Sequence, residues 1–134
     1  MRKAITIIAL LFGTALCAES QESPPCSLAN VAGDWAFTNH GKSPTGEFNG
    51  IGAIRIAKDG SVTGHGWIIV GGTVSVEKTY VGTTEVNADC TSTGTFEGTP
   101  APSHCVILAN RTKMWCVYEA PLDITVTLEK IGRP

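Results

Sequence analysis

The sequence predicts an all-β protein in which eight or nine antiparallel strands form an up-and-down meander closed into a barrel. The first observation is composition: the chain has 134 residues, 15 of them glycine, is rich in threonine and valine, and has only 16% charged residues, which favours strands over helices. The second is a succession of short β-prone stretches about ten residues apart, separated by turn residues. The third is that so long a meander exposes two sheet edges unless its ends pair. The length is typical of one domain.

The connections between the expected strands are short, which makes sequential strands antiparallel. Turn residues occur at 58–61, 71–72, 87–89 and 110–111. The expected strands cover residues 34–39, 50–57, 62–70, 73–81, 83–86, 91–97, 104–109, 113–119 and 123–131. The pattern leaves open whether the fourth and fifth of these are separate or continuous.

Alternation of apolar and polar residues predicts which side chains face the barrel interior. The stretch 62–70 is apolar on both faces towards its end, so the pattern assigns it no inner face. The side chains expected to face inward are Ile124, Val126 and Leu128 of the last strand, with Trp35, Phe37, Ile54 and Ile56 of earlier strands.

Glycines inside the expected strands fit a strongly curved sheet, because glycine lets a barrel strand bend without clashes. Gly52, Gly64 and Gly66 are such positions. Together with Ala53 they would leave space in the interior. An eight-stranded barrel is just wide enough to be filled by its own side chains or to hold one small ligand.

The N-terminus is typical of a secretory signal peptide: a short basic start is followed by about thirteen mostly apolar residues. We expect cleavage after Ala18, a flexible leader over residues 19–25 and a single barrel domain over 26–134. Cys17 offers an alternative, a lipid-modified cysteine, but Leu16 stands where that chemistry needs a small residue. The expected location is secreted or periplasmic, with no membrane span after signal removal.

Four cysteines remain after this cleavage, and an even number in a small exported domain typically forms disulfides. A two-residue turn at residues 110–111 would place Cys105 opposite Cys116 across a hairpin, within bridging range. Cys26 would then pair with Cys90 and close a much longer loop. We prefer this pairing, and the two other pairings stay open.

Charge and motifs exclude several functions. The formal net charge is −2 and becomes more negative once Arg2 and Lys3 leave with the signal peptide, which disfavours a nucleic-acid partner. No metal or cofactor is expected, because cysteines and histidines lack ligand spacing. Motifs of serine hydrolases, zinc proteases and nucleotide-binding enzymes are also absent. Asn110 opens an N-glycosylation triplet that matters only in a eukaryotic secretory pathway.

A few side chains are candidates for catalysis or ligand binding. His65 lies between two glycines that would expose its imidazole, and Tyr80, Lys78 and Glu85 could form a polar cluster for proton transfer. The alternative for His65 is an ordinary side chain of the barrel wall, and the alternative for the polar cluster is a solvent-exposed strand face. The side chains that could line a ligand pocket are Trp35, Phe37, His65, Trp67, Tyr80 and Trp115. Tyr118, together with Trp67, Trp115 and Tyr80, could also line an apolar pocket or a protein-binding patch, although large aromatics in a small β domain are more often core.

The segment Leu28-Ala29-Asn30-Val31-Ala32-Gly33-Asp34-Trp35 resembles the opening segment of calycin-type barrels, in which a short 3-10 turn leads into a Gly-x-Trp first strand. In lipocalins that tryptophan closes the barrel floor and a late arginine packs on it; Arg133 is the late arginine here. The fragments Cys-Ser-Leu-Ala, Asp-Gly-Ser-Val-Thr-Gly and Val-Asn-Ala-Asp-Cys-Thr are similar to small exported bacterial barrels akin to allene oxide cyclase. The resemblance implies a barrel and adds little about activity.

Three functions are compatible with these observations. The preferred hypothesis is a barrel that binds a small apolar ligand. The second is a protein-binding module, for instance an exported hydrolase inhibitor, that uses loops at residues 40–49 and 97–103. The third is a cyclase similar to allene oxide cyclase, with His65, Glu85 and Tyr80 as its candidate catalytic residues. An enzyme is less expected than a binding protein.

Overall fold

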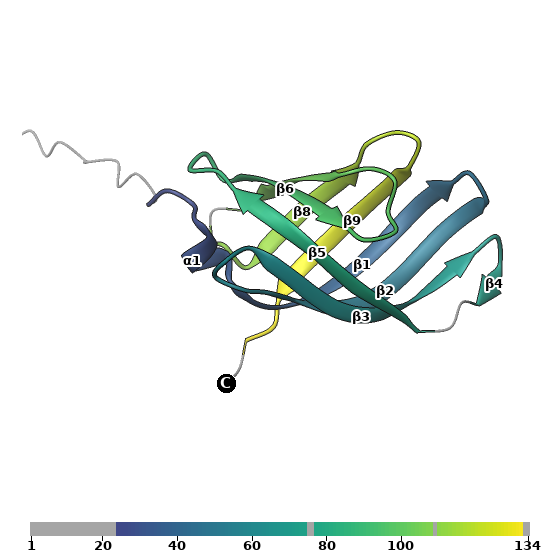
Figure 1. Cartoon of the computed structure of the whole chain (residues 1–134), viewed down its shortest axis with the longest axis horizontal. Coiled ribbons are helices and arrows are strands. Elements are labelled where there is room, and N and C mark those ends of the chain that lie inside the picture. The colour runs from purple at the N-terminus through teal and green to yellow at the C-terminus, as the bar shows by residue number, and fades with distance from the viewer. Residues whose placement is uncertain (1–23, 75–76, 109, 133–134) are drawn as a thin grey trace, which may run out of the picture.

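The computed structural model describes residues 24–74, 77–108 and 110–132 (Figure 1). Residues 1–23, which hold the expected signal peptide and most of the expected leader, lie outside this part, as does Arg133. Within it, the chain forms one short helix, α1 (Leu28–Val31), and the strands β1 (Gly33–Ser43), β2 (Gly46–Ile56), β3 (Ser61–Val70), β4 (Thr73–Val74), β5 (Lys78–Val86), β6 (Thr91–Phe96), β7 (Ser103–Ile107), β8 (Lys113–Tyr118) and β9 (Asp123–Lys130).

Eight of these strands close into an antiparallel barrel, as predicted. The order around the sheet is β2-β1-β9-β8-β7-β6-β5-β3, and an additional pairing of β2 with β3 completes the ring. β4 pairs with the end of β3, through Ile69↔Val74 and Val70↔Thr73. The first and last strands pair over eight positions, from Trp35↔Lys130 to Lys42↔Asp123. The barrel therefore has no long free edge among the described residues.

The largest differences from the predicted strands are at two places. The expected strands 73–81 and 83–86 become a two-residue β4 and a continuous β5. The expected loop at residues 40–49 is a β-hairpin instead, because β1 and β2 stay paired as far as Ser43↔Gly46. Gly41 permits this extension: a Cβ there would lie 1.9 Å from the backbone oxygen of Asp123 in the neighbouring β9.

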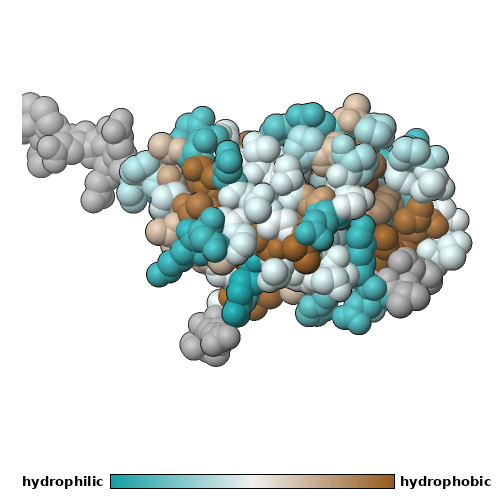
Figure 2. All heavy atoms as spheres, viewed as in Figure 1, coloured by the Kyte–Doolittle hydropathy of each residue, from teal (hydrophilic) through white to brown (hydrophobic). Residues whose placement is uncertain are grey.

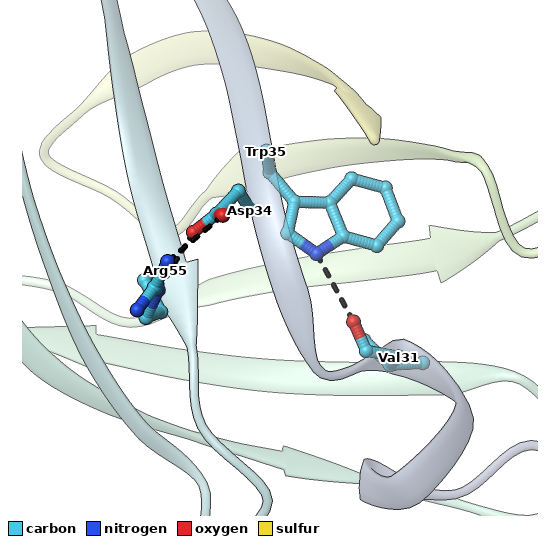
Figure 3. A network of polar contacts seen from close by, with 4 residues as sticks. All are labelled: Val31, Asp34, Trp35 and Arg55. Carbon is cyan, nitrogen blue, oxygen red and sulfur yellow. Dashed lines mark hydrogen bonds and ion pairs between the residues drawn. The ribbon is translucent and has the colours of Figure 1, made fainter. Parts of the chain in front are cut away.

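The end of the barrel next to α1, which we call the floor, is closed by Trp35. Its side chain is fully buried, and its indole N–H donates a 3.0 Å hydrogen bond to the Val31 carbonyl, while the preceding Asp34 faces outward to Arg55 (Figure 3). The Lys130 ammonium lies 5.5 Å from the centre of the Trp35 ring and donates to the Asn30 carbonyl. A lysine thus packs on this tryptophan, at a position where the resemblance implied an arginine.

The turn before β1 is α-helical and not 3-10 as expected. The Ser27 carbonyl accepts the Val31 N–H, and the Leu28 carbonyl accepts the Ala32 N–H, which is the α-helical spacing. The Asn30 side chain bridges the start of this turn, since it accepts the Ser27 N–H and donates to the Pro25 carbonyl. These contacts stabilise the helical turn itself, and the hydrogen bonds from Trp35 and Lys130 connect it to the barrel floor.

Both predicted disulfides are confirmed. Cys26–Cys90 ties the segment before α1 to the turn between β5 and β6, and Cys105–Cys116 crosses the β7–β8 hairpin with a Cα–Cα distance of 4.0 Å. The predicted hairpin register is correct, but its turn is longer than two residues: the Arg111 N–H donates to the Leu108 carbonyl and Arg111 takes a positive φ of 54°.

The predicted inward faces are correct. Trp35, Phe37, Ile54, Ile56, Ile124 and Leu128 are all buried, and Val126 packs against the same core. The stretch that the sequence left unassigned faces inward with Val62, Gly64 and Gly66, and outward with His65 and Trp67.

The expected space beside the strand glycines is filled. A Cβ at Gly52 would lie 2.6 Å from Cζ of Phe37, and one at Gly66 would lie 3.1 Å from the same atom. Ala53 contributes no interior space either, because it pairs with the outward-facing Ala36 and His65. The glycines therefore let the strands and the Phe37 ring approach each other closely, and they do not create a cavity.

Replacement of Gly52 by alanine is expected to lower the free energy of unfolding by about 1–3 kcal/mol, since the new methyl group would meet the His65 carbonyl oxygen at 2.4 Å. Urea denaturation measures this loss. Gly132→Ala is the control, because nothing lies within 4 Å of a Cβ there; equal stabilities of the two variants would contradict the close packing.

Candidate functional site

The barrel end opposite α1, which we call the mouth, is open and leads to a small interior cavity. The cavity has a volume of about 60 Å³ and is lined mainly by apolar side chains of the barrel core, among them Phe37, Ile54 and Met114. The mouth adds a hollow of about 190 Å³, and Asn39, Tyr80 and Tyr118 line both spaces. Hydrophobic side chains gather at this end of the molecule, where β4 lies (Figure 2).

Two buried polar atoms lie where the cavity meets the mouth. Asn39 Oδ1 and the Tyr80 hydroxyl are both enclosed, and neither has a hydrogen-bond partner among the described residues. A buried polar group without a partner costs about 1–3 kcal/mol. A ligand hydroxyl that donates to Asn39 Oδ1 and accepts from Tyr80 would remove this cost.

The two tyrosines are held in their neutral form. Burial raises the pKa of Tyr80, and burial together with the neighbouring Tyr80 raises the pKa of Tyr118 to about 12. Both phenols therefore keep their protons at neutral pH and can donate hydrogen bonds. Aromatic contacts fix the Tyr80 ring, which meets Phe37 edge-on at 5.4 Å and Phe96 at 6.3 Å between ring centres.

Lys78 is the one charged side chain that lines the mouth within the described ranges. Its ammonium lies 5.6 Å from the centre of the Tyr80 ring, which is within the range of a cation–π contact. The mouth thus combines an apolar wall with two phenols, an amide and one cation. This set can bind a polar group at the rim while an apolar group enters the cavity.

The structure separates the residues that the sequence singled out as ligand-binding. Phe37 and Tyr80 line the cavity. Trp35 lies beneath it in the floor, and its N–H already has a partner. His65, Trp67 and Trp115 are on the outer surface, where the two tryptophans are 49% and 59% exposed.

The three candidate catalytic residues do not converge. Tyr80 points into the barrel, whereas His65 and Glu85 are exposed on its outer surface, on β3 and β5. His65 contacts the edge of Trp67, with ring centres 6.1 Å apart. Glu85 is paired in register with Thr93 of β6. No metal-binding group of three histidine, cysteine or acidic side chains forms within the described part of the chain.

Asn39 was missed from the sequence, whereas Tyr118 was named among the aromatics that could line an apolar pocket, and it does line the cavity. The strand pattern carries a signal for both. Asn39 lies in phase with Trp35 and Phe37 along β1, so it is a polar residue at an inward position. Tyr118 lies in the same phase as Met114 and Cys116 along β8. A polar side chain at a strand position that otherwise carries inward-facing apolar residues indicates a site inside a barrel.

No protein-family model, curated protein or solved structure matches this chain. Among the helices that the structure describes, none is long and apolar enough to cross a membrane.

Proposed function

We propose that the protein is an exported binding barrel for a small amphipathic ligand, whose apolar group enters the interior cavity and whose polar group binds at the mouth. The observation that carries the proposal is the pair of enclosed atoms, Asn39 Oδ1 and the Tyr80 hydroxyl, that lack protein partners. The cavity and mouth are both smaller than the roughly 300–1,000 Å³ of drug-sized pockets. The proposed ligand is correspondingly small.

Two further features support this proposal. The disulfides Cys26–Cys90 and Cys105–Cys116 are typical of exported proteins, in line with the proposed signal peptide. The floor, with Trp35 beneath a late cation, Lys130, is similar to that of calycin barrels, and we propose a calycin-like identity. The protein-binding and cyclase hypotheses stay predictions, and the separation of His65 and Glu85 from Tyr80 gives the cyclase no additional support.

The experiment compares two isomeric probes, 1-hexanol and 1-methoxypentane, by NMR titration of the Asn39 side-chain amide. We expect 1-hexanol to bind more tightly, because only it can donate a hydrogen bond to Asn39 Oδ1 while accepting one from Tyr80. Tyr80→Phe should weaken binding of 1-hexanol about tenfold or more, the loss of roughly one buried hydrogen bond.

Stability gives an independent check of the same variant. Because Tyr80→Phe removes a buried hydroxyl without a partner, we expect the free energy of unfolding to rise by about 1 kcal/mol. The control is Asn49→Ala, which removes an exposed amide from the outer face of β2. Absence of 1-hexanol binding, or equal binding by both probes and both variants, would overturn the proposal.

A further inference from the structure

A second hollow lies on the outer surface of the barrel and is lined by residues of β6, β7, β8 and β9. Figure 1 shows the labelled strands β6, β8 and β9 of this wall. The volume of the hollow is about 800 Å³, which is within the size range of ligand pockets, whereas the interior cavity is not. We call it the outer groove. The side chains of Val106, Trp115, Val117 and the groove threonines point away from the interior, so a ligand stacked on them would not use the mouth site. Four other residues of the groove are inward-facing and also line the interior cavity: Ser92, Cys105, Cys116 and Val126.

The middle of the outer groove is apolar and its two sides carry hydroxyl groups. Val106 on β7 and Trp115 on β8 are directly paired, and Val117 follows on the same face of β8. All three are more than half exposed. The flanking strands place threonines on both sides: Thr91 and Thr93 on β6, and Thr125 and Thr127 on β9.

Hydrogen-bonding groups lie next to the tryptophan. Thr127 is directly opposite Trp115 in the sheet, on the exposed face of β9. On the other flank, the Thr93 hydroxyl contacts His104 Nδ1 at 3.3 Å, and the Asn87 amide donates to the Thr91 hydroxyl. These hydroxyls each have capacity for a further hydrogen bond.

The outer groove is uncharged. Its lining includes no lysine, arginine, aspartate or glutamate, and its only titratable side chain, His104, contacts Glu119 through Nε2. A charged ligand would therefore lose hydration without gaining an ion pair inside the groove. The absence of charge in the lining favours a neutral ligand.

From this arrangement we infer that the outer groove binds a neutral saccharide, with a pyranose ring stacked on Trp115. The C–H face of a pyranose ring is apolar and packs on an indole ring, while its hydroxyls project sideways. Here the sideways positions are those of the threonines on β6 and β9.

Trp67 provides a matched control for Trp115. It is the other highly exposed tryptophan, at 49%, and it does not line the outer groove. It lies on β3, four strands from β8 around an eight-stranded ring and therefore on the opposite side of the barrel. Trp115→Ala and Trp67→Ala thus remove the same ring from comparable surface positions.

The experiment is isothermal titration of the oxidised protein with three neutral probes: cellohexaose, maltohexaose and hexa-N-acetylchitohexaose. We expect at least one probe to bind, Trp115→Ala to weaken its binding about tenfold or more, and Trp67→Ala to leave it within about twofold. Thr127→Val should weaken binding by a smaller factor, because it keeps the side-chain shape and removes one hydroxyl. Tyr80→Phe should have no effect, which separates this site from the proposed mouth site.

Three results would overturn the inference. The first is no binding of any of the three probes to the wild-type protein. The second is an equal loss of binding in Trp115→Ala and Trp67→Ala. The third is a wild-type protein that self-associates in sedimentation experiments and becomes monomeric in Trp115→Ala, which would assign this face to a second copy of the chain.

Discussion

Replacement of Trp35 by alanine is expected to lower the free energy of unfolding by about 3–5 kcal/mol, the usual cost of removing a buried aromatic ring. The Trp35 side chain has no exposed surface and closes the floor beneath the core. Its loss also leaves the Val31 carbonyl without its indole donor and the Lys130 ammonium without its ring. Urea denaturation of the oxidised protein measures the change.

Trp67→Ala is the control for this prediction, because Trp67 is half exposed on the outer wall. Surface substitutions of this kind usually change stability by about 0.5 kcal/mol or less. Trp35→Phe should fall between the two, since it retains an aromatic ring and loses the hydrogen bond to Val31. Similar losses in Trp35→Ala and Trp67→Ala would contradict the assignment of Trp35 to the floor.

Removal of the Cys26–Cys90 disulfide is expected to cost about 4 kcal/mol, against about 3 kcal/mol for Cys105–Cys116. The reason is the length of the closed loop: the bridges span 64 and 11 residues, and the longer loop restricts the unfolded chain more. The variants are Cys26→Ala with Cys90→Ala, and Cys105→Ala with Cys116→Ala, compared by urea denaturation.

The two disulfide variants should also differ in local dynamics. Cys26 holds the segment before α1 through its bridge and through the hydrogen bond from its N–H to the Ala88 carbonyl. Without the bridge, we expect faster hydrogen exchange at Val31 and Ala32, whose N–H groups form the helical turn. A larger stability loss from the hairpin bridge than from the long-range bridge would contradict the prediction.

Much of the fold could be predicted because period-two alternation and turn residues are local signals. The alternation in β9 indicated Ile124, Val126 and Leu128 as inward residues, and the register of the β7–β8 hairpin paired Cys105 with Cys116. Both follow from neighbouring residues alone. The closure of the barrel followed from a general argument about exposed edges.

The candidate site was predicted less well, because alternation does not say which face is inside where a strand carries apolar residues on both faces or polar residues on both faces. In β3 both faces are apolar towards the strand end, so Trp67 could not be assigned. The glycines beside His65 indicate the inner face of β3. If Gly64 and Gly66 face inward and let neighbouring strands approach closely, His65 between them must point outward. The same logic places Glu85 and Tyr80 on opposite faces of β5, because five positions separate them.

The outer groove could not be predicted from local pattern, since it depends on four strands being side by side. Trp115 and Thr127 are twelve positions apart in the chain, and only the β8–β9 register brings them together. Thr93 on β6 lies in the same groove because it pairs with His104 on β7, which in turn pairs with Val117 on β8. Composition alone indicated a threonine-rich sheet and said nothing about where its hydroxyls would gather.

The pairing of β1 with β9 determines when the barrel can close during synthesis of the chain. The strand that completes the ring is the last to be made, and it pairs with the first, about ninety residues earlier in the chain. Until β9 emerges, β1 and β8 each have an open edge, and Trp35 has no Lys130 or Leu128 above it. A nascent chain that stops before residue 123 would therefore expose two unpaired strand edges and an incompletely packed core. We expect such a chain to aggregate or to be degraded by proteases.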